Sequence, residues 1–165
     1  MRTVIALVIA TMVITSCNGQ SGAVKDQQSA YKVLADMKKK GAIAASDNGY
    51  TMTCLIDGKP WKANVLYPTA MTGRIFGENG ESHISLDDPD TYEEGKKIDI
   101  ATHAAEFNPP NAGNELWGGH SGEVEITKVG NGWVEGKFHF TAAVMNTNKK
   151  MEITNGFFRV ALKKR

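Results

Sequence analysis

Long hydrophobic runs, cysteines and an excess of one charge are all scarce in this sequence of 165 residues. The one extended apolar run, residues 4–14, is shorter than the roughly 20 residues that a membrane-spanning helix needs. The 19 basic side chains are balanced by 18 acidic ones, so no overall field attracts nucleic acid. We therefore expect a chain that does not bind nucleic acid and whose apolar run is no membrane span.

The apolar run instead has the features of an export signal. Met1-Arg2 supplies a short basic region, and Ile14-Thr15-Ser16-Cys17 closes the run. The closing residues resemble a bacterial lipobox in its looser form, in which a cysteine thiol accepts a diacylglyceryl group. We expect a signal peptide at 1–16, a lipid anchor on Cys17 that binds the membrane, and a location in the cell envelope at the outer membrane. The alternative is a soluble secreted protein.

With only two cysteines, lipidation of Cys17 would leave Cys54 alone and exclude an internal disulfide. Within Met52–Ile56, alternation places Cys54 with Met52 and Ile56 on one face of a strand, the expected core face. A buried core thiol is therefore expected at Cys54.

Between the anchor and the main domain, residues 17–49 are expected to form a lipidated tether with a short helix. Tyr31, Leu34 and Met37 recur every three residues within 25–40, and Gly41 follows as a candidate C-cap.

From residue 50 onward the hydrophobic period becomes two, which is typical of strands. Asp57-Gly58, Gly130-Asn131-Gly132, Asn146-Thr147-Asn148 and Asn155-Gly156 read as turns. Strands joined so tightly must pair antiparallel. The sequence therefore predicts an all-β domain over 50–165, an antiparallel β-sandwich or barrel of about eight strands. The expected strands are 51–56, 61–65, 83–86, 97–100, 123–127, 134–140, 151–153 and 158–162.

Four segments carry a family resemblance: Met52–Ala63, Ser121–Thr127, Val134–Phe140 and Ile153–Phe158. Together they resemble small Bacteroidota lipoproteins that carry a β-rich domain of unknown function, over about residues 50–162. The resemblance implies the fold and a lipid anchor. It implies no reaction, cofactor or catalytic residue.

Several patterns resemble sites of chemistry, and none supports a catalytic assignment. Gly119-His120-Ser121-Gly122-Glu123 lacks the final glycine of a nucleophile elbow and precedes a strand rather than a helix. The acidic run 87–95 lacks EF-hand spacing, and the four histidines lack zinc-site spacing. We expect no enzyme activity, no metal and no cofactor, with a weak calcium site at the acidic run as the alternative.

The segment 107–119 is expected to be a long exposed loop, rich in Asn, Gly and Pro, that carries an aromatic residue. Loops on a rigid scaffold often hold recognition residues, so Trp117, Asn114 and His120 are the candidate ligand-binding residues. The alternative, weighed equally, is that Trp117 plugs the end of a barrel.

These features predict a lipid-anchored envelope protein that acts as a non-catalytic binding module for a glycan, a peptide or an envelope partner. The alternative is an inhibitor or immunity-type protein that blocks a cell-wall enzyme or toxin. A hydrolase that uses His and Asp from separate loops is the third and weakest hypothesis.

Overall fold

The computed structural model describes residues 43–45, 49–87, 89–102, 104–113 and 115–162. The expected signal peptide, the lipidation site at Cys17 and the expected helix within 25–40 lie outside these residues. Within the described ranges, no helix is long and apolar enough to span a membrane.

Eleven strands form a single antiparallel sheet in the described part of the chain. The elements are β1 (Ile43–Ala44), β2 (Thr51–Ile56), β3 (Lys59–Lys62), β4 (Val65–Tyr67), one helical turn α2 (Thr69–Thr72), β5 (Arg74–Asn79), β6 (Ser82–Asp87), β7 (Lys97–Asp99), β8 (Ala105–Asn108), β9 (Trp117–Gly130), β10 (Trp133–Val144) and β11 (Lys150–Ala161).

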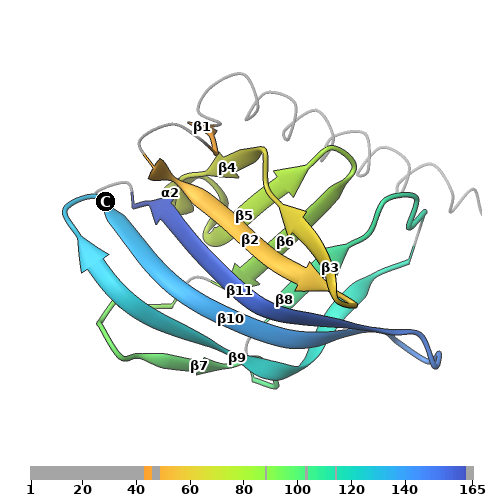
Figure 1. Cartoon of the computed structure of the whole chain (residues 1–165). Coiled ribbons are helices and arrows are strands. Elements are labelled where there is room, and N and C mark those ends of the chain that lie inside the picture. The colour runs from red at the N-terminus through yellow and green to blue at the C-terminus, as the bar shows by residue number, and fades with distance from the viewer. Residues whose placement is uncertain (1–42, 46–48, 88, 103, 114, 163–165) are drawn as a thin grey trace, which may run out of the picture. The chain divides into compact units, whose positions relative to one another are not determined.

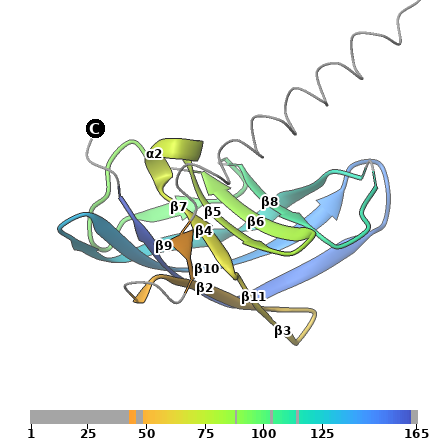
Figure 2. The ribbon, with the colours of Figure 1, turned by 90° about the horizontal axis from the view of Figure 1, so that it is seen from above.

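The sheet is curled into a half-barrel (Figures 1 and 2). Its strand order is β1-β4-β5-β6-β8-β9-β10-β11-β2-β3, and β7 pairs with β9 beside this path. The two views show β5 and β6 on the opposite side of the curl from β10 and β11. The expected all-β antiparallel fold is confirmed.

The expected number of strands was too low. The single strand expected at 61–65 is two, β3 and β4, because the backbone N–H of Asn64 bonds to Glu78 of β5 instead of continuing along β2. Strands β1, β5 and β8 were missed, and β1 places residues 43–44 of the expected tether in the sheet.

The turn expected at Asn155-Gly156 is wrong, because both residues lie within β11. Asn155 has a positive φ of 50°. Thr154 and Asn155 together oppose the single residue His139 of β10, and the register against β2 shifts at the same place. The Asn-Gly pair therefore forms a β-bulge. The turns at 57–58, 131–132 and 145–149 connect strands as expected.

The extent of the long loop is also corrected. Phe107 and Asn108 belong to β8, and Trp117 to Gly119 belong to β9, so the connection is only 109–116. The chain re-enters the sheet because Trp117 pairs with Val144 of β10.

The core fills the inside of the curl with side chains from every second residue. Met52, Ile84, Ile126 and Phe158 are fully buried, and burial of such side chains stabilises the fold by about 1.5–3 kcal/mol each. Cys54 also belongs to the core, with 4 % of its surface exposed. Its burial raises the pKa of the thiol to about 12. The expected core thiol is confirmed.

Candidate functional site

The three expected ligand-binding residues are placed differently from one another. Trp117 is buried, with 5 % of its surface exposed, and its indole Nε1 has no hydrogen-bond partner in the described residues. His120 is exposed in β9, where it is the extra residue of a bulge opposite Thr141 and Ala142. Asn114 lies outside the described residues. The burial of Trp117 favours its role as a packing residue.

The Gly-His-Ser-Gly stretch, expected as a flexible entry to a strand that begins at Glu123, already lies within β9 and does not form an elbow. Ser121 pairs with Thr141 of β10. Gly122 has a φ of 138°, and a Cβ there would lie 2.2 Å from the carbonyl oxygen of His139. Glycine at 122 therefore permits close approach of two strands and does not expose a nucleophile.

The structure shows a different candidate site, at the place where the two ends of the sheet meet. The chain crosses from one end to the other directly after β3. The Ala63 N–H donates to Met52 O of β2 at 2.9 Å, and the Asn64 N–H donates to Glu78 O of β5 at 2.8 Å. We call this junction of β3 with β5 and β6 the seam.

One buried hydrogen bond crosses the seam between side chains. The indole Nε1 of Trp61, on β3, donates to Ser82 Oγ at the start of β6, over 2.9 Å. The Ser82 hydroxyl in turn donates to Asn79 O at 2.9 Å. These bonds tie the edge strand β3 to the β5–β6 turn.

Beside this bond lies a groove of about 450 Å³, which we call the seam groove. Such a volume is in the range of ligand sites, roughly 300–1,000 Å³. Its lining comes from the β2–β3 turn, the β5–β6 turn, the start of β11 and the connection after β8, which Figure 1 shows at one end of the curled sheet. The lining residues are Ile56, Asp57, Lys59, Pro60, Trp61, Asn79, Ser82, Phe107, Pro109, Pro110 and Met151.

Most polar groups of the seam groove are already engaged within the protein. Trp61 and Ser82 bond to each other, as described. Asp57 Oδ1 accepts the Glu152 N–H at 2.9 Å, while the Asp57 N–H donates to Glu152 O at 2.9 Å. What remains accessible is mainly apolar surface, together with the side chains of Lys59 and Asn79 at the rim.

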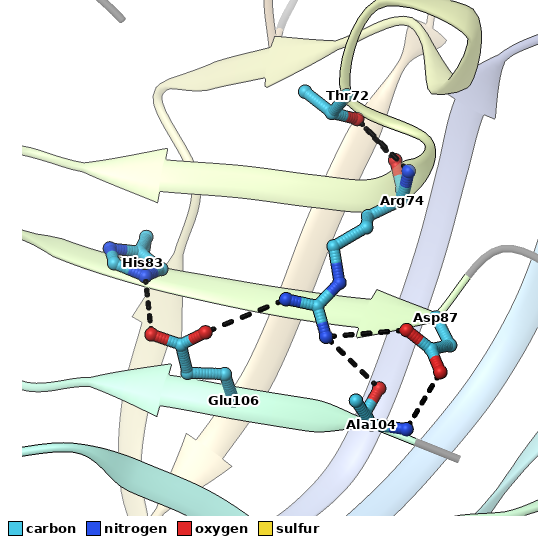
Figure 3. Close-up of polar contacts among 6 residues, drawn as sticks. All are labelled: Thr72, Arg74, His83, Asp87, Ala104 and Glu106. Carbon is cyan, nitrogen blue, oxygen red and sulfur yellow. Dashed lines mark hydrogen bonds and ion pairs between the residues drawn. The ribbon is translucent and has the colours of Figure 1, made fainter. Parts of the chain in front are cut away.

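A second polar site lies on β5, β6 and β8 (Figure 3). The Arg74 guanidinium lies between two carboxylates, 3.3 Å from Asp87 Oδ1 and 3.5 Å from Glu106 Oε2. Glu106 Oε1 is 3.3 Å from His83 Nε2. The hydrogen bond from His83, aided by its charge and that of Arg74, holds the pKa of Glu106 below its usual value against the opposing effect of burial.

This polar cluster joins three strands, and its His83 forms no hydrogen bond with a serine that could act as a nucleophile in the described residues. Asp87 Oδ2 accepts the Ala104 N–H at 2.7 Å, which fixes the start of β8. Ser85, on the same strand as His83, is buried, and its Oγ has no hydrogen-bond partner in the described residues. A serine without a base in hydrogen-bond reach lacks the arrangement of an activated nucleophile. The cluster is best explained as a cross-strand ionic network.

Within the acidic run, Thr91 binds the ammonium group of a nearby lysine, Lys96. Lys96 Nζ donates to Thr91 O at 3.2 Å and to Thr91 Oγ1 at 3.1 Å. The Glu94 carboxylate accepts the Val129 N–H at 3.2 Å. Among the described residues, no group of three or more His, Cys, Asp or Glu side chains could hold a metal ion.

Sequence reasoning missed the seam groove because its residues are dispersed along the chain, from 56 to 151. The one local signal was Asp57-Gly58-Lys59-Pro60-Trp61, a tight turn with an aromatic directly after it. The expected loop contributes Pro109 and Pro110 to the groove, although Trp117 does not line it.

A search of curated proteins and a search of solved structures each found no match. A family model does match, over residues 48–161, which includes nearly all of the described sheet. The chain therefore belongs to the family defined by DUF6252, a domain of unknown function.

Proposed function

We propose that this protein is a lipid-anchored component of the cell envelope that binds a glycan, a peptide or an envelope protein and does not catalyse a reaction. The binding site in this proposal is the seam groove. The observation that carries it is an accessible, mostly apolar groove on a rigid antiparallel scaffold, with its internal polar atoms already satisfied.

The anchor rests on the sequence. A basic start, an apolar run and Ile14-Thr15-Ser16-Cys17 support lipidation of Cys17, and we place the chain with the small lipoproteins of Bacteroidota and at the outer membrane. Two or more acyl chains give stable anchoring, since each buried methylene contributes about 0.8 kcal/mol. A Cys17→Ser variant should therefore leave the membrane fraction of cells, while one that stays there would contradict the anchor.

Filling the seam groove tests the binding site. Asn79 is exposed, and its backbone carbonyl, not its side chain, accepts the Ser82 hydroxyl. An Asn79→Trp change should therefore place an indole in the groove and leave the fold intact. The matched control is Asn131→Trp at the exposed β9–β10 turn.

The measurement is retention of the purified full chain, in detergent, on isolated envelope fractions: peptidoglycan, outer-membrane polysaccharide and outer-membrane proteins. We expect wild type and Asn131→Trp to be retained alike on one fraction, and Asn79→Trp to bind it about tenfold more weakly, which corresponds to about 1.4 kcal/mol. Equal retention of all three proteins would exclude the seam groove as the site.

A further inference from the structure

The seam groove offers a ligand little hydrogen bonding. Trp61 Nε1, the Ser82 hydroxyl and Asp57 Oδ1 all have partners within the protein. A sugar hydroxyl placed there would lose its bonds to water without replacing them, which is costly. An aliphatic or aromatic side chain would gain by leaving water. The groove therefore suits an apolar group better than a glycan.

A second hollow adjoins the seam groove at β3. This second hollow, of about 460 Å³, shares Pro60 and Trp61 with the seam groove. Its other lining residues are Thr53, Cys54, Leu55, Lys62 and Asn155. Two hollows that adjoin at β3 fit an extended ligand better than a compact one.

The exposed edge strand β3 carries two positive charges, and the carboxylate of Asp57 lies in the adjoining turn. Lys59 lines the seam groove and Lys62 lines the second hollow, and both side chains are exposed. Neither ammonium group takes part in an ion pair of the described residues. A ligand that crosses β3 and carries negative charge on both sides of its apolar group would complement this edge.

Backbone pairing with the edge strand is hindered. Pro60 lies in the middle of β3 and has no N–H to donate to an added strand. A partner at this edge must therefore be held mainly by side-chain contacts, not by β-strand addition of the kind that main-chain hydrogen bonds support.

We propose that the occupant of the seam groove is a segment of a polypeptide partner that inserts an apolar side chain into the groove and sets acidic residues against Lys59 and Lys62. This inference rests on the proposed function and names the class of ligand that the same site takes.

The test is a selection from a random 12-residue peptide library displayed on phage, with the full chain in detergent as bait. The Asn79→Trp variant serves for counter-selection, because it fills the groove. Peptides that require the groove should be enriched in Phe, Leu or Met next to Asp or Glu. Enrichment of basic or wholly hydrophilic peptides, or no enrichment over counter-selection, would overturn the proposal.

Charge reversal tests whether Lys59 and Lys62 contribute to binding more than other exposed lysines do. The double variant Lys59→Glu with Lys62→Glu should weaken binding of a selected peptide by about tenfold or more, the scale of lost charge complementarity at an interface. The control Lys137→Glu reverses another exposed lysine, on β10. Equal weakening by both changes would overturn the role of the edge.

A glycan array, probed with wild type and with Asn79→Trp, distinguishes the failure of this inference from failure of the proposed function. Groove-dependent binding to glycans without groove-dependent peptides would overturn the polypeptide ligand and keep the binding function. No groove-dependent binding in either experiment would overturn both.

Discussion

At the scale of single residues, the Trp61–Ser82 hydrogen bond is the side-chain contact that ties β3 to β6 across the seam. It is buried and joins positions 21 residues apart in the chain. Removing either partner destabilises the fold for a different reason. The Trp61→Phe change leaves the Ser82 hydroxyl still bonded to Asn79 O. The Ser82→Ala change leaves the buried indole N–H of Trp61 without an acceptor.

We therefore expect Trp61→Phe to lower the free energy of unfolding by about 1–2 kcal/mol and Ser82→Ala by about 1–3 kcal/mol. The double variant should lose less free energy of unfolding than the sum of the two single changes, because all three variants lack the same hydrogen bond. Urea denaturation of the four proteins gives the coupling energy. Strict additivity would show that the bond across the seam contributes nothing to stability.

The polar cluster of Figure 3 predicts an acid-sensitive contribution to stability. The pKa of Glu106 lies below its usual value of 4.5, chiefly through the hydrogen bond from His83. A lowered carboxylate pKa stabilises the folded state above the unfolded pKa, and this contribution disappears as the pH falls through the folded pKa.

The difference in free energy of unfolding between wild type and Glu106→Gln should therefore shrink as the pH falls below about 4.5, the usual pKa of the carboxyl group. Chemical denaturation at a series of pH values measures it. A difference that grows on acidification would contradict the direction of the pKa shift.

At the scale of elements, the bulge in β11 is the feature that the sequence suggested least. Asn155-Gly156 has the composition of a hairpin turn, but pairing with β10 resumes at Gly156 and continues to Ala161. The reason is tertiary: a Cβ on Gly156 would lie 2.4 Å from Phe138 O and 2.5 Å from the Phe138 ring. The Asn-Gly pair therefore forms the bulge in β11 and allows β11 to lie close to Phe138 of β10.

A Gly156→Ala change should therefore cost about 1–3 kcal/mol in the free energy of unfolding, as overpacking does. The control is Gly118→Ala in β9, where a Cβ would meet nothing within 4 Å; it should stay within about 0.5 kcal/mol of wild type. Thermal unfolding of both variants is the measurement. Similar melting temperatures would show that the strands separate easily at the bulge.

Alternation predicted strands in which large apolar side chains occupy most of the inward positions, as Val134, Phe138 and Phe140 do in β10. Strand β5 was missed because Gly77 occupies one of its inward positions, where a Cβ would lie 2.8 Å from Met52 Sδ. The glycine breaks the apolar pattern in the sequence, although the strand is regular in the sheet. The sequence pattern of β5 alone cannot show that Met52, from another strand, fills the space beside Gly77.

At the scale of the whole molecule, the fold class was predictable and the site was not. Short turns between alternating segments require antiparallel pairing, which is a local argument. The seam groove requires knowing that β3 and the β5–β6 turn meet, which depends on the closure of the curl through Ala63 and Asn64. Trp117 was proposed because it follows a polar loop, yet its pairing with Val144 buries it.

Closure through the seam also explains how the proposed binding site is built at one end of the curled sheet. Four separate parts of the chain that meet at this end of the sheet supply the walls of the groove, so a ligand there would contact segments that already support one another. Recognition on a preformed scaffold avoids much of the ordering cost of binding.

Site-directed photo-crosslinking in intact cells tests this account most directly. A photoreactive phenylalanine analogue at position 79 lies at the rim of the seam groove, and the same analogue at position 131 lies at an exposed turn outside the groove lining. We expect a discrete protein adduct from position 79 that is absent from position 131 and is lost when Lys59 and Lys62 are reversed to glutamate. Identical adducts from both positions, or an adduct from position 131 alone, would contradict a binding site at the seam.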